Sequence, residues 1–249
     1  MRKFLQTILL VLVILLTRCF AQAKSTDKPI WSQQAIPLDL SCATIPSRIP
    51  SPDHRSLVEI TCTRKAEEDA AYMLRITTRK GVAYDTPLRD GAHEMVWSPD
   101  SKAFFIDGGA TAYSGFFVTV YVIDPSGSIQ KRILTQVAQR DMVESFPPCK
   151  AFNRDPIACT RIAANPEYNM SGIAWVHNSS AIDVFAEIPC SSSYGGIMCQ
   201  VLGYELSVPD GRILKRLTAR QVQSRWQKQM AWKMHIPDAP VYGPAQNIR

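Results

Sequence analysis

The sequence predicts a mainly β protein made of about three to five four-stranded meanders, with two inserted or appended helices. Three observations favour this fold class. A tight polar turn between an apolar entry and a β-rich exit recurs along the chain, and a strand, a glycine turn and a second strand follow each copy. In addition, 17 Pro and 12 Gly among 249 residues interrupt long helices. A twisted β-sandwich is the alternative architecture.

The polar turn is clearest in residues 95–106, which contain the run Trp97-Ser98-Pro99-Asp100. A weaker copy at 173–184 keeps an aromatic residue, Trp175, and a fainter copy at 50–60 has Pro50 in that place. We expect Asp100 to accept hydrogen bonds from its own turn, as Asp does in Asx turns.

The second half of each repeat places a strand directly before a glycine. Residues 72–77 precede Gly81, residues 117–123 precede Gly127, and residues 201–206 precede Gly211. Glycine supplies the positive φ that hairpin turns require. The 46 residues that separate Gly81 from Gly127 match one propeller repeat, and the longer gap before Gly211 indicates an insertion.

Two helices are predicted beside the repeats, one in an insertion at about 135–170 and one at about 218–234. The first helix should occupy residues 136–146. In the second, Thr218 and Gln221 form a capping-box pattern. Apolar side chains then recur every four residues on one helical face: Val222, Trp226, Met230 and Met234.

The run Trp97-Ser98-Pro99-Asp100-Ser101-Lys102, followed by an apolar strand, resembles the blade signature of bacterial TolB-like and WD-repeat-like β-propeller proteins. Gly often stands in place of Ser101 in that signature, and the match is partial in the other two copies. The resemblance implies a small or degenerate propeller-like array. Three visible repeats are fewer than the four to eight blades of a typical propeller. Either residues 36–40 join Val241 and Tyr242 to complete a blade from both termini, or the three meanders form an open or irregular assembly. It implies no particular activity, because one fold hosts many functions.

The amino terminus predicts export. Residues 1–3 are Met-Arg-Lys, an apolar run extends from 4 to 16, and Ala21-Gln22-Ala23 fits a cleavage site, so we expect residues 1–23 to be a signal peptide and 24–249 a single domain. A retained membrane anchor and lipidation at Cys19 are the alternatives. The expected location is the periplasm or the medium.

The net charge and its distribution argue against a polyanionic partner. Loss of residues 1–23 removes three basic residues and no acid, which lowers the net charge from +6 to +3. No block of consecutive basic residues remains, so nucleic acid is not expected as a partner. The basic side chains of the carboxy-terminal helix give a possible weak peripheral contact with anionic membranes; they are Arg220, Arg225, Lys228 and Lys233.

Cysteine usage agrees with export. The exported chain has an even number of cysteines, which fits a disulfide set. Their grouping favours the pairs Cys42–Cys62, Cys149–Cys159 and Cys190–Cys199. Neither a metal nor a cofactor is expected, because the cysteines lack zinc-knuckle spacing and the four His are scattered.

The candidate binding residues lie in the connections between the second and third strands of the meanders. Residues 107–115 and 189–196 each place a Tyr beside Ser and Gly, a composition suited to recognition. The predicted ligand contacts are Tyr113, Ser114, Tyr194, Asp107 and Glu187. We expect them to bind a protein or peptide partner on one face of the molecule.

No catalytic residues are assigned, because no nucleophile lies in a Gly-x-Ser-x-Gly elbow and no His has a triad context. The sequence therefore favours a non-catalytic binding or scaffold protein. The alternative is a secreted, glycosidase-like hydrolase that uses loop carboxylates such as Asp107 and Glu187.

Overall fold

The computed structural model describes residues 28–38, 47–62, 72–88, 91, 93–109, 116–146, 168–189 and 199–234. These residues form thirteen strands and two helices, and every strand pairing is antiparallel. The predicted mainly β class is confirmed. In the described part of the chain, no helix combines the length and the apolar character needed to cross a bilayer.

Three meanders account for twelve of the strands, at the positions of the sequence repeat. The first sheet is β2 (Ser47–Pro50), β3 (Leu57–Cys62), β4 (Tyr72–Thr77) and β5 (Ala83–Leu88). The second is β6 (His93–Trp97), β7 (Ala103–Gly108), β8 (Phe117–Ile123) and β9 (Ile129–Ile133), with β1 (Ile36–Leu38) added beside β6. The third is β10 (Asn169–Val176), β11 (Ala181–Glu187), β12 (Val201–Ser207) and β13 (Ile213–Thr218).

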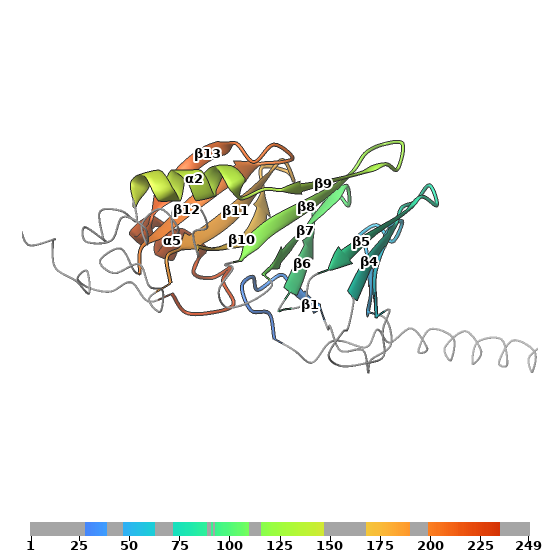
Figure 1. Ribbon diagram of the computed structural model, residues 1–249, viewed down its shortest axis with the longest axis horizontal. Helices are drawn as coiled ribbons and strands as arrows, with labels where there is room; N and C mark the ends of the chain where they lie inside the picture. Colours follow the sequence, from blue (N-terminus) through green and yellow to red (C-terminus); the bar gives the residue numbers. More distant parts are fainter. Residues whose placement is uncertain are drawn as a thin grey trace, which may run out of the picture.

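The three sheets stack face to face in chain order, with the second sheet in the middle (Figure 1). Val58, Ile76 and Phe104 belong to the core between the first and second sheets. Phe105 and Val184 belong to the core between the second and third. Because it packs on both sides, the second sheet is buried at every position of β6 and β7.

The arrangement differs from the sandwich alternative, since three sheets are stacked instead of two. It also differs from a closed ring among the described residues, because the far face of the first sheet has no described neighbour (Figure 1). Residues 36–38 do form a strand, but β1 pairs with β6, with Ile36 opposite Met95. The expected partners Val241 and Tyr242 lie outside the described residues. The propeller-like description stays a prediction.

Glycine fixes the hairpin turns as expected, with φ of +73° at Gly81, +91° at Gly127 and +67° at Gly211. These left-handed values cost glycine little and other residues more. The predicted turn residues therefore sit where the backbone needs them.

Helix α2 (Gln136–Ser145) lies within the predicted segment 136–146 and packs Ala138 and Met142 on the core between the second and third sheets. Helix α5 (Ala219–Trp226) covers the far face of the third sheet, where Val222 and Trp226 pack beside Phe185. The capping box predicted for Thr218 and Gln221 is present.

Helix α5 is shorter than the prediction of about 218–234, because it ends at Trp226. Met230 and Met234 still reach the same apolar cluster, but from a non-helical segment. The Gln227 side chain donates to the Trp232 carbonyl at 2.8 Å and accepts from the Met234 amide at 2.9 Å. These bonds satisfy backbone groups that a longer helix would have paired internally.

Candidate functional site

One end of the stack consists of tight turns, which we call the turn end. It contains residues 51–56, 78–82, 98–102, 124–128, 177–180 and 208–212. Turns of neighbouring sheets touch: the Asp53 amide donates to Ser101 Oγ at 3.1 Å, and a Cβ at Gly127 would lie 2.9 Å from Thr78 Oγ1. A side-chain hydrogen bond between Asp100 and Ser179 joins the second sheet to the third in the same way. The tight turns of all three sheets therefore lie at the same end of the stack.

Two of these turns are built alike, as the repeat predicted. Ser98 donates to Asp100 at 2.7 Å and accepts from the Ala103 amide at 2.9 Å. Ser51 makes the equivalent bonds to Asp53 and from the Ser56 amide, at 2.6 and 3.0 Å. Asp100 thus has the structural role expected of it.

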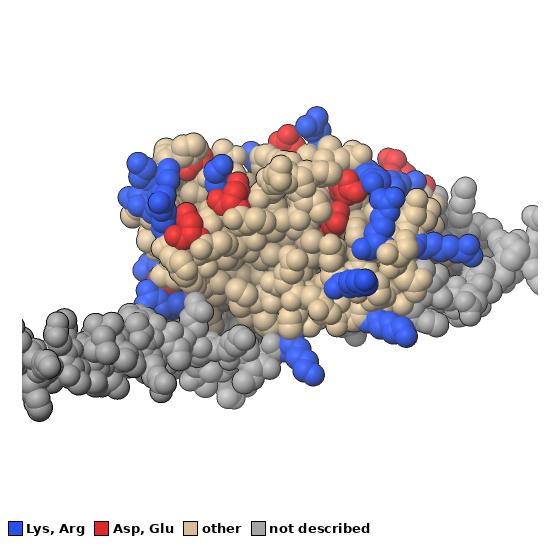
Figure 2. Space-filling view, turned by 180° about the vertical axis from the view of Figure 1, so that it is seen from behind, with Lys and Arg blue, Asp and Glu red and all other residues tan. Residues whose placement is uncertain are grey.

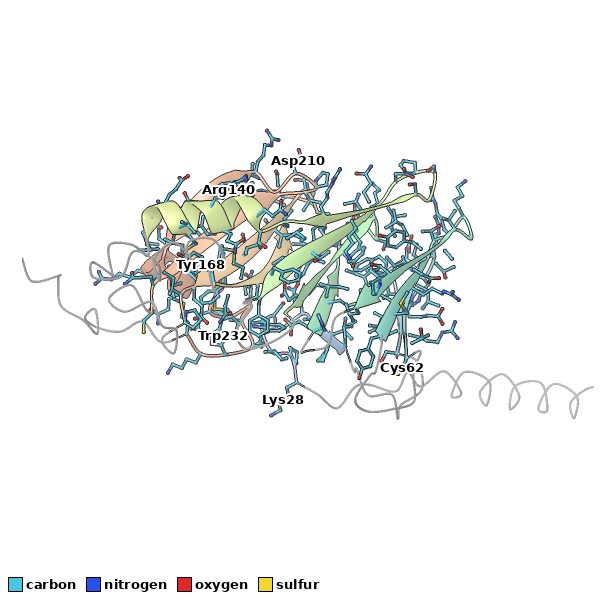
Figure 3. All side chains as sticks on the ribbon, in the orientation of Figure 1. Lys28, Cys62, Arg140, Tyr168, Asp210 and Trp232 are labelled. Atoms are coloured by element: carbon cyan, nitrogen blue, oxygen red, sulfur yellow. The ribbon has the colours of Figure 1, made fainter. Side chains whose placement is uncertain are left out.

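The opposite end, which we call the loop end, is where β3, β7 and β11 finish and β4, β8 and β12 begin. Cys62, the last residue of β3, lies there, whereas Asp210 of the β12–β13 turn lies at the other end (Figure 3). The connections 63–71, 109–116 and 188–200 leave from this end, and each is longer than any connection of the turn end. Binding residues commonly sit on long loops that a rigid scaffold positions.

Two acids that face each other, Glu94 and Asp107, lie at the base of the loop end; we call them the acid pair. They are opposite residues on β6 and β7, and both are 0% exposed. Asp107 Oδ1 accepts from the Gly172 amide of β10 at 2.8 Å. Burial, and next the Glu94 carboxylate, raise the pKa of Asp107 well above its ordinary value, against that hydrogen bond.

Glu94 holds residues 30–35, which we call the strap. Its carboxylate accepts from the amides of Ile30 at 2.8 Å, Trp31 at 3.1 Å and Ser32 at 2.7 Å. Burial raises the pKa of Glu94, but these three N–H groups oppose the rise. Glu94 is therefore the acid of the pair that is best placed to carry a negative charge.

The strap joins distant parts of the chain at the loop end. Ser32 Oγ donates to the Ile173 carbonyl of β10 at 2.7 Å. The Gln33 amide donates to the Gln229 carbonyl at 2.8 Å, and the Ala231 amide donates to the Trp31 carbonyl at 2.9 Å. The segments that begin and end the described chain are thus paired with each other.

The structure describes two of the five predicted ligand contacts, Asp107 and Glu187. Tyr113, Ser114 and Tyr194 lie outside the described residues, so their contact with a ligand stays a prediction. Asp107 is described, and it has no exposed surface with which to touch a ligand. The position of Asp107 directly before the loop suggested a contact with a ligand. Because side chains alternate along β7, the Asp107 side chain instead points into the interface between the second and third sheets, as that of Phe105 does.

Glu187 lies at the end of β11, half-buried, and accepts from Asn169 Nδ2 at 3.1 Å. Burial raises its pKa, and that hydrogen bond opposes the shift. Along β11, Val184 and Ala186 pack toward the second sheet and Phe185 packs on the other face. Glu187 shares the parity of Phe185, so it and Asp107 lie on opposite sides of the third sheet. The structure does not bring the two carboxylates of the hydrolase alternative together.

A cluster around Asp183 and Glu205 was missed. These acids are opposite residues on β11 and β12, on the face of the third sheet that carries α5. Glu205 binds His177 Nε2 at 3.1 Å and Lys215 Nζ at 3.2 Å. Burial favours a higher pKa for Glu205, but these two partners outweigh it and lower the pKa.

Asp183 has the opposite shift from its neighbour. It is 4% exposed, and no described residue makes a hydrogen bond to its Oδ1. Burial, and next the Glu205 carboxylate, raise the pKa of Asp183 to about 7, although Lys215 and other cations oppose the shift. An acid inside an apolar run, Ala181-Ile182-Asp183-Val184-Phe185, was the sequence signal that could have located this cluster.

The described residues include only two of the six cysteines after the predicted signal peptide. Cys62 lies at the end of β3, and Cys199 lies just before β12. Cys42, Cys149, Cys159 and Cys190 lie outside the described residues, so the three pairings stay predictions. No three His, Cys, Asp or Glu side chains of the described residues are grouped so that they could hold a metal ion.

The basic residues of the carboxy-terminal segment are exposed, namely Arg220, Arg225, Lys228 and Lys233. Figure 2 shows Lys and Arg gathered toward the left and right sides of the view, with few charges in the middle of that face. The apolar side of α5 is buried on the third sheet, so α5 has no free apolar face to insert into lipid. Weak electrostatic contact with a membrane stays a prediction.

Comparisons with family models, curated proteins and solved structures give no match to this chain. The resemblance of residues 97–102 to TolB-like and WD-repeat-like blades therefore stays a prediction.

Proposed function

We propose that the protein is an exported, non-catalytic binding or scaffold protein that recognises a protein or peptide partner through its loop end. One observation carries the proposal: the long connections of all three sheets leave from the same end of an aligned stack. A shared end lets three separate connections contribute to one surface. Tight turns at the other end offer shorter and more uniform segments.

The braces at the base of the loop end also support this function. The acid pair links the second sheet to the third through Gly172, and the strap links both to residues 229–231. Strands held in this way keep the starting points of the loops fixed. A rigid base reduces the conformational entropy that a binding surface loses when its partner binds.

Glycoside hydrolysis is not the function we propose. It needs two carboxyl groups about 5 to 9 Å apart that flank one bond. Asp107 and Glu187, the acids considered for it, lie on opposite sides of the third sheet, and Asp107 is buried.

Site-specific photocrosslinking in the intact cell envelope tests the proposal. A photoreactive amino acid is placed at Tyr113 or Tyr194 on loop-end connections, and at Ser126 or Asp210 as matched turn-end controls. Ser126 and Asp210 are exposed, so the probe does not disturb packing. We expect the loop-end positions to give a discrete adduct with another protein, and the turn-end positions to give none.

The substitutions Tyr113→Ala and Tyr194→Ala in one chain should then lower partner recovery at least tenfold, the loss expected when two interface anchors are removed. The folded stability of that variant should stay unchanged. Equal adducts from both ends, or no adduct from either, would contradict recognition through the loop end.

A further inference from the structure

The outer face of the first sheet carries a row of charges that alternate in sign. Arg48, Glu59, Arg75 and Asp85 are consecutive partners across β2, β3, β4 and β5. Arg48 Nε lies 3.0 Å from Glu59, and Arg75 Nε lies 2.8 Å from Asp85. Their side chains are 65%, 23%, 53% and 41% exposed in row order, so the row is open to solvent.

Two uncharged rows flank the charged one on the same face. On one side are Pro50, Leu57, Thr77 and Ala83, and on the other are Thr61, Met73 and Pro87. The residues between these rows, such as Val58 and Ile76, point into the core beneath. On this face, one charged stripe therefore lies between two stripes of apolar and small side chains.

The outer faces of the first and third sheets differ in what covers them. Helix α5 covers the far face of the third sheet with Val222 and Trp226. Among the described elements, none lies on the outer face of the first sheet, which is on the opposite side of the molecule from α5 (Figure 1).

The order of the charges is complementary to itself. Read from β2 to β5 the row is plus, minus, plus, minus, and read backwards it is minus, plus, minus, plus. A two-fold axis parallel to the strands places each residue opposite the one at the mirrored position of a second copy. Arg48 then faces Asp85, and Glu59 faces Arg75, so every charge meets its opposite.

The same axis brings each uncharged row onto its own counterpart, with Leu57 opposite Thr77 and Thr61 opposite Met73. A two-fold axis along the row would instead set Arg48 on Arg48 and Glu59 on Glu59, which is repulsive. We infer that the outer face of the first sheet is an isologous contact between two copies of this chain, with the two-fold axis parallel to the strands.

The size of the face predicts a weak and reversible dimer. Four strands about 4.8 Å apart and six residues of about 3.3 Å each give roughly 400 Å² of projected area. Standard interfaces bury about 800 Å² on each partner. We therefore expect dimers at concentrations of roughly 10 to 100 μM, and fewer dimers when salt screens the charged row.

Sedimentation velocity of the purified protein over this concentration range, at low and high salt, measures the association. Arg75→Glu gives the row plus, minus, minus, minus, which sets two carboxylates against each other at the positions of β3 and β4. Glu59→Arg gives plus, plus, plus, minus, which sets two cations together there. We expect either variant to weaken self-association at least tenfold, and Arg220→Glu on α5, the matched control, to leave it unchanged.

The decisive arm mixes the two variants. Arg75→Glu and Glu59→Arg are complementary to each other at all four positions, so their 1:1 mixture should dimerise as the unmodified protein does. Far-ultraviolet circular dichroism checks that each variant is folded. A protein that stays monomeric throughout, variants that still self-associate, or a mixture that stays monomeric would each overturn the inference.

Discussion

Glu94 and Asp107 face each other across β6 and β7, and neither residue has exposed surface, so both carboxyl groups are shielded from solvent. Two negative charges at neighbouring positions in such a site repel strongly. Among the described residues, Glu94 receives three backbone N–H groups, whereas Asp107 receives only that of Gly172. We infer that Glu94 is the more readily ionised acid of the pair and that Asp107 holds its proton more readily.

This assignment predicts unequal stability costs when the two acids are neutralised. Asp107→Asn should change the free energy of unfolding at pH 7 by less than about 1 kcal/mol, because Asn is neutral, similar in shape and retains an acceptor for Gly172. Glu94→Gln should cost about 2 to 4 kcal/mol, because one amide oxygen cannot accept from all three strap residues. Urea unfolding of both variants measures the difference, and equal costs would contradict this assignment.

Asp183 predicts a pH dependence of stability. Its folded-state pKa of about 7 exceeds the unfolded value of about 3.9, so the folded state binds the proton more tightly. The stability from this group is complete below pH 4 and is lost as the pH rises toward 7. Asp183→Asn removes that loss. The variant should nearly match the unmodified protein at pH 4 and be about 4 kcal/mol more stable at pH 8.

Unfolding measurements at pH 4, 6 and 8 check this difference. Asp210→Asn at an exposed turn is the matched control, and its pH profile should follow that of the unmodified protein. A stability difference between Asp183→Asn and the unmodified protein that does not grow with pH would contradict the raised pKa.

The repeat predicts equal costs at two equivalent turns. Ser98→Ala and Ser51→Ala each remove one hydroxyl that donates to an Asp and accepts from a backbone amide. Each should lower the free energy of unfolding by about 1 to 2 kcal/mol, with the two values within about 0.5 kcal/mol of each other. Ser126→Ala, at an exposed turn, should cost less than about 0.5 kcal/mol. Thermal or urea unfolding provides all three values, and unequal costs at Ser98 and Ser51 would mean that the turns are not energetically equivalent.

The fold was predictable where its causes are local. A Ser-x-Asp turn, a glycine with positive φ and a capping box each act within a few residues, and each appears where the pattern placed it. The carboxy-terminal helix was predicted too long for the same reason. The spacing of Trp226 and Met230 fits a helix, but the strap, almost 200 residues away in sequence, pairs with the segment after Trp226.

The site was less predictable, because long-range packing decides which acids are buried. Asp107 follows an apolar strand and precedes a loop, so sequence alone cannot tell a ligand contact from a brace. Its partner Gly172 is 65 residues away, and the partners of Glu94 are more than 60 away. The usable signal was an acid within or beside an apolar run, where it must find a special partner. Asp183 lies within such a run, Asp107 directly follows one and Glu94 directly precedes one.

Gly203 predicts how closely α5 must approach the third sheet. A Cβ at this position would lie 2.5 Å from Val222 and 2.7 Å from the Trp226 ring, closer than real Cβ contacts. Gly203→Ala should therefore push α5 away and lower the free energy of unfolding by about 2 to 3 kcal/mol. Trp226 fluorescence should shift to longer wavelength as its ring gains contact with water.

Gly81 gives the matched comparison, because a Cβ there meets nothing within 4 Å and only its φ of +73° opposes a side chain. Gly81→Ala should cost about 1 kcal/mol and leave tryptophan fluorescence unchanged. If Gly203→Ala matched Gly81→Ala in both its unfolding free energy and its fluorescence, α5 would not pack as closely on β12 as the distances at Gly203 indicate. The pair of variants thus separates steric exclusion by a helix from backbone strain in a turn.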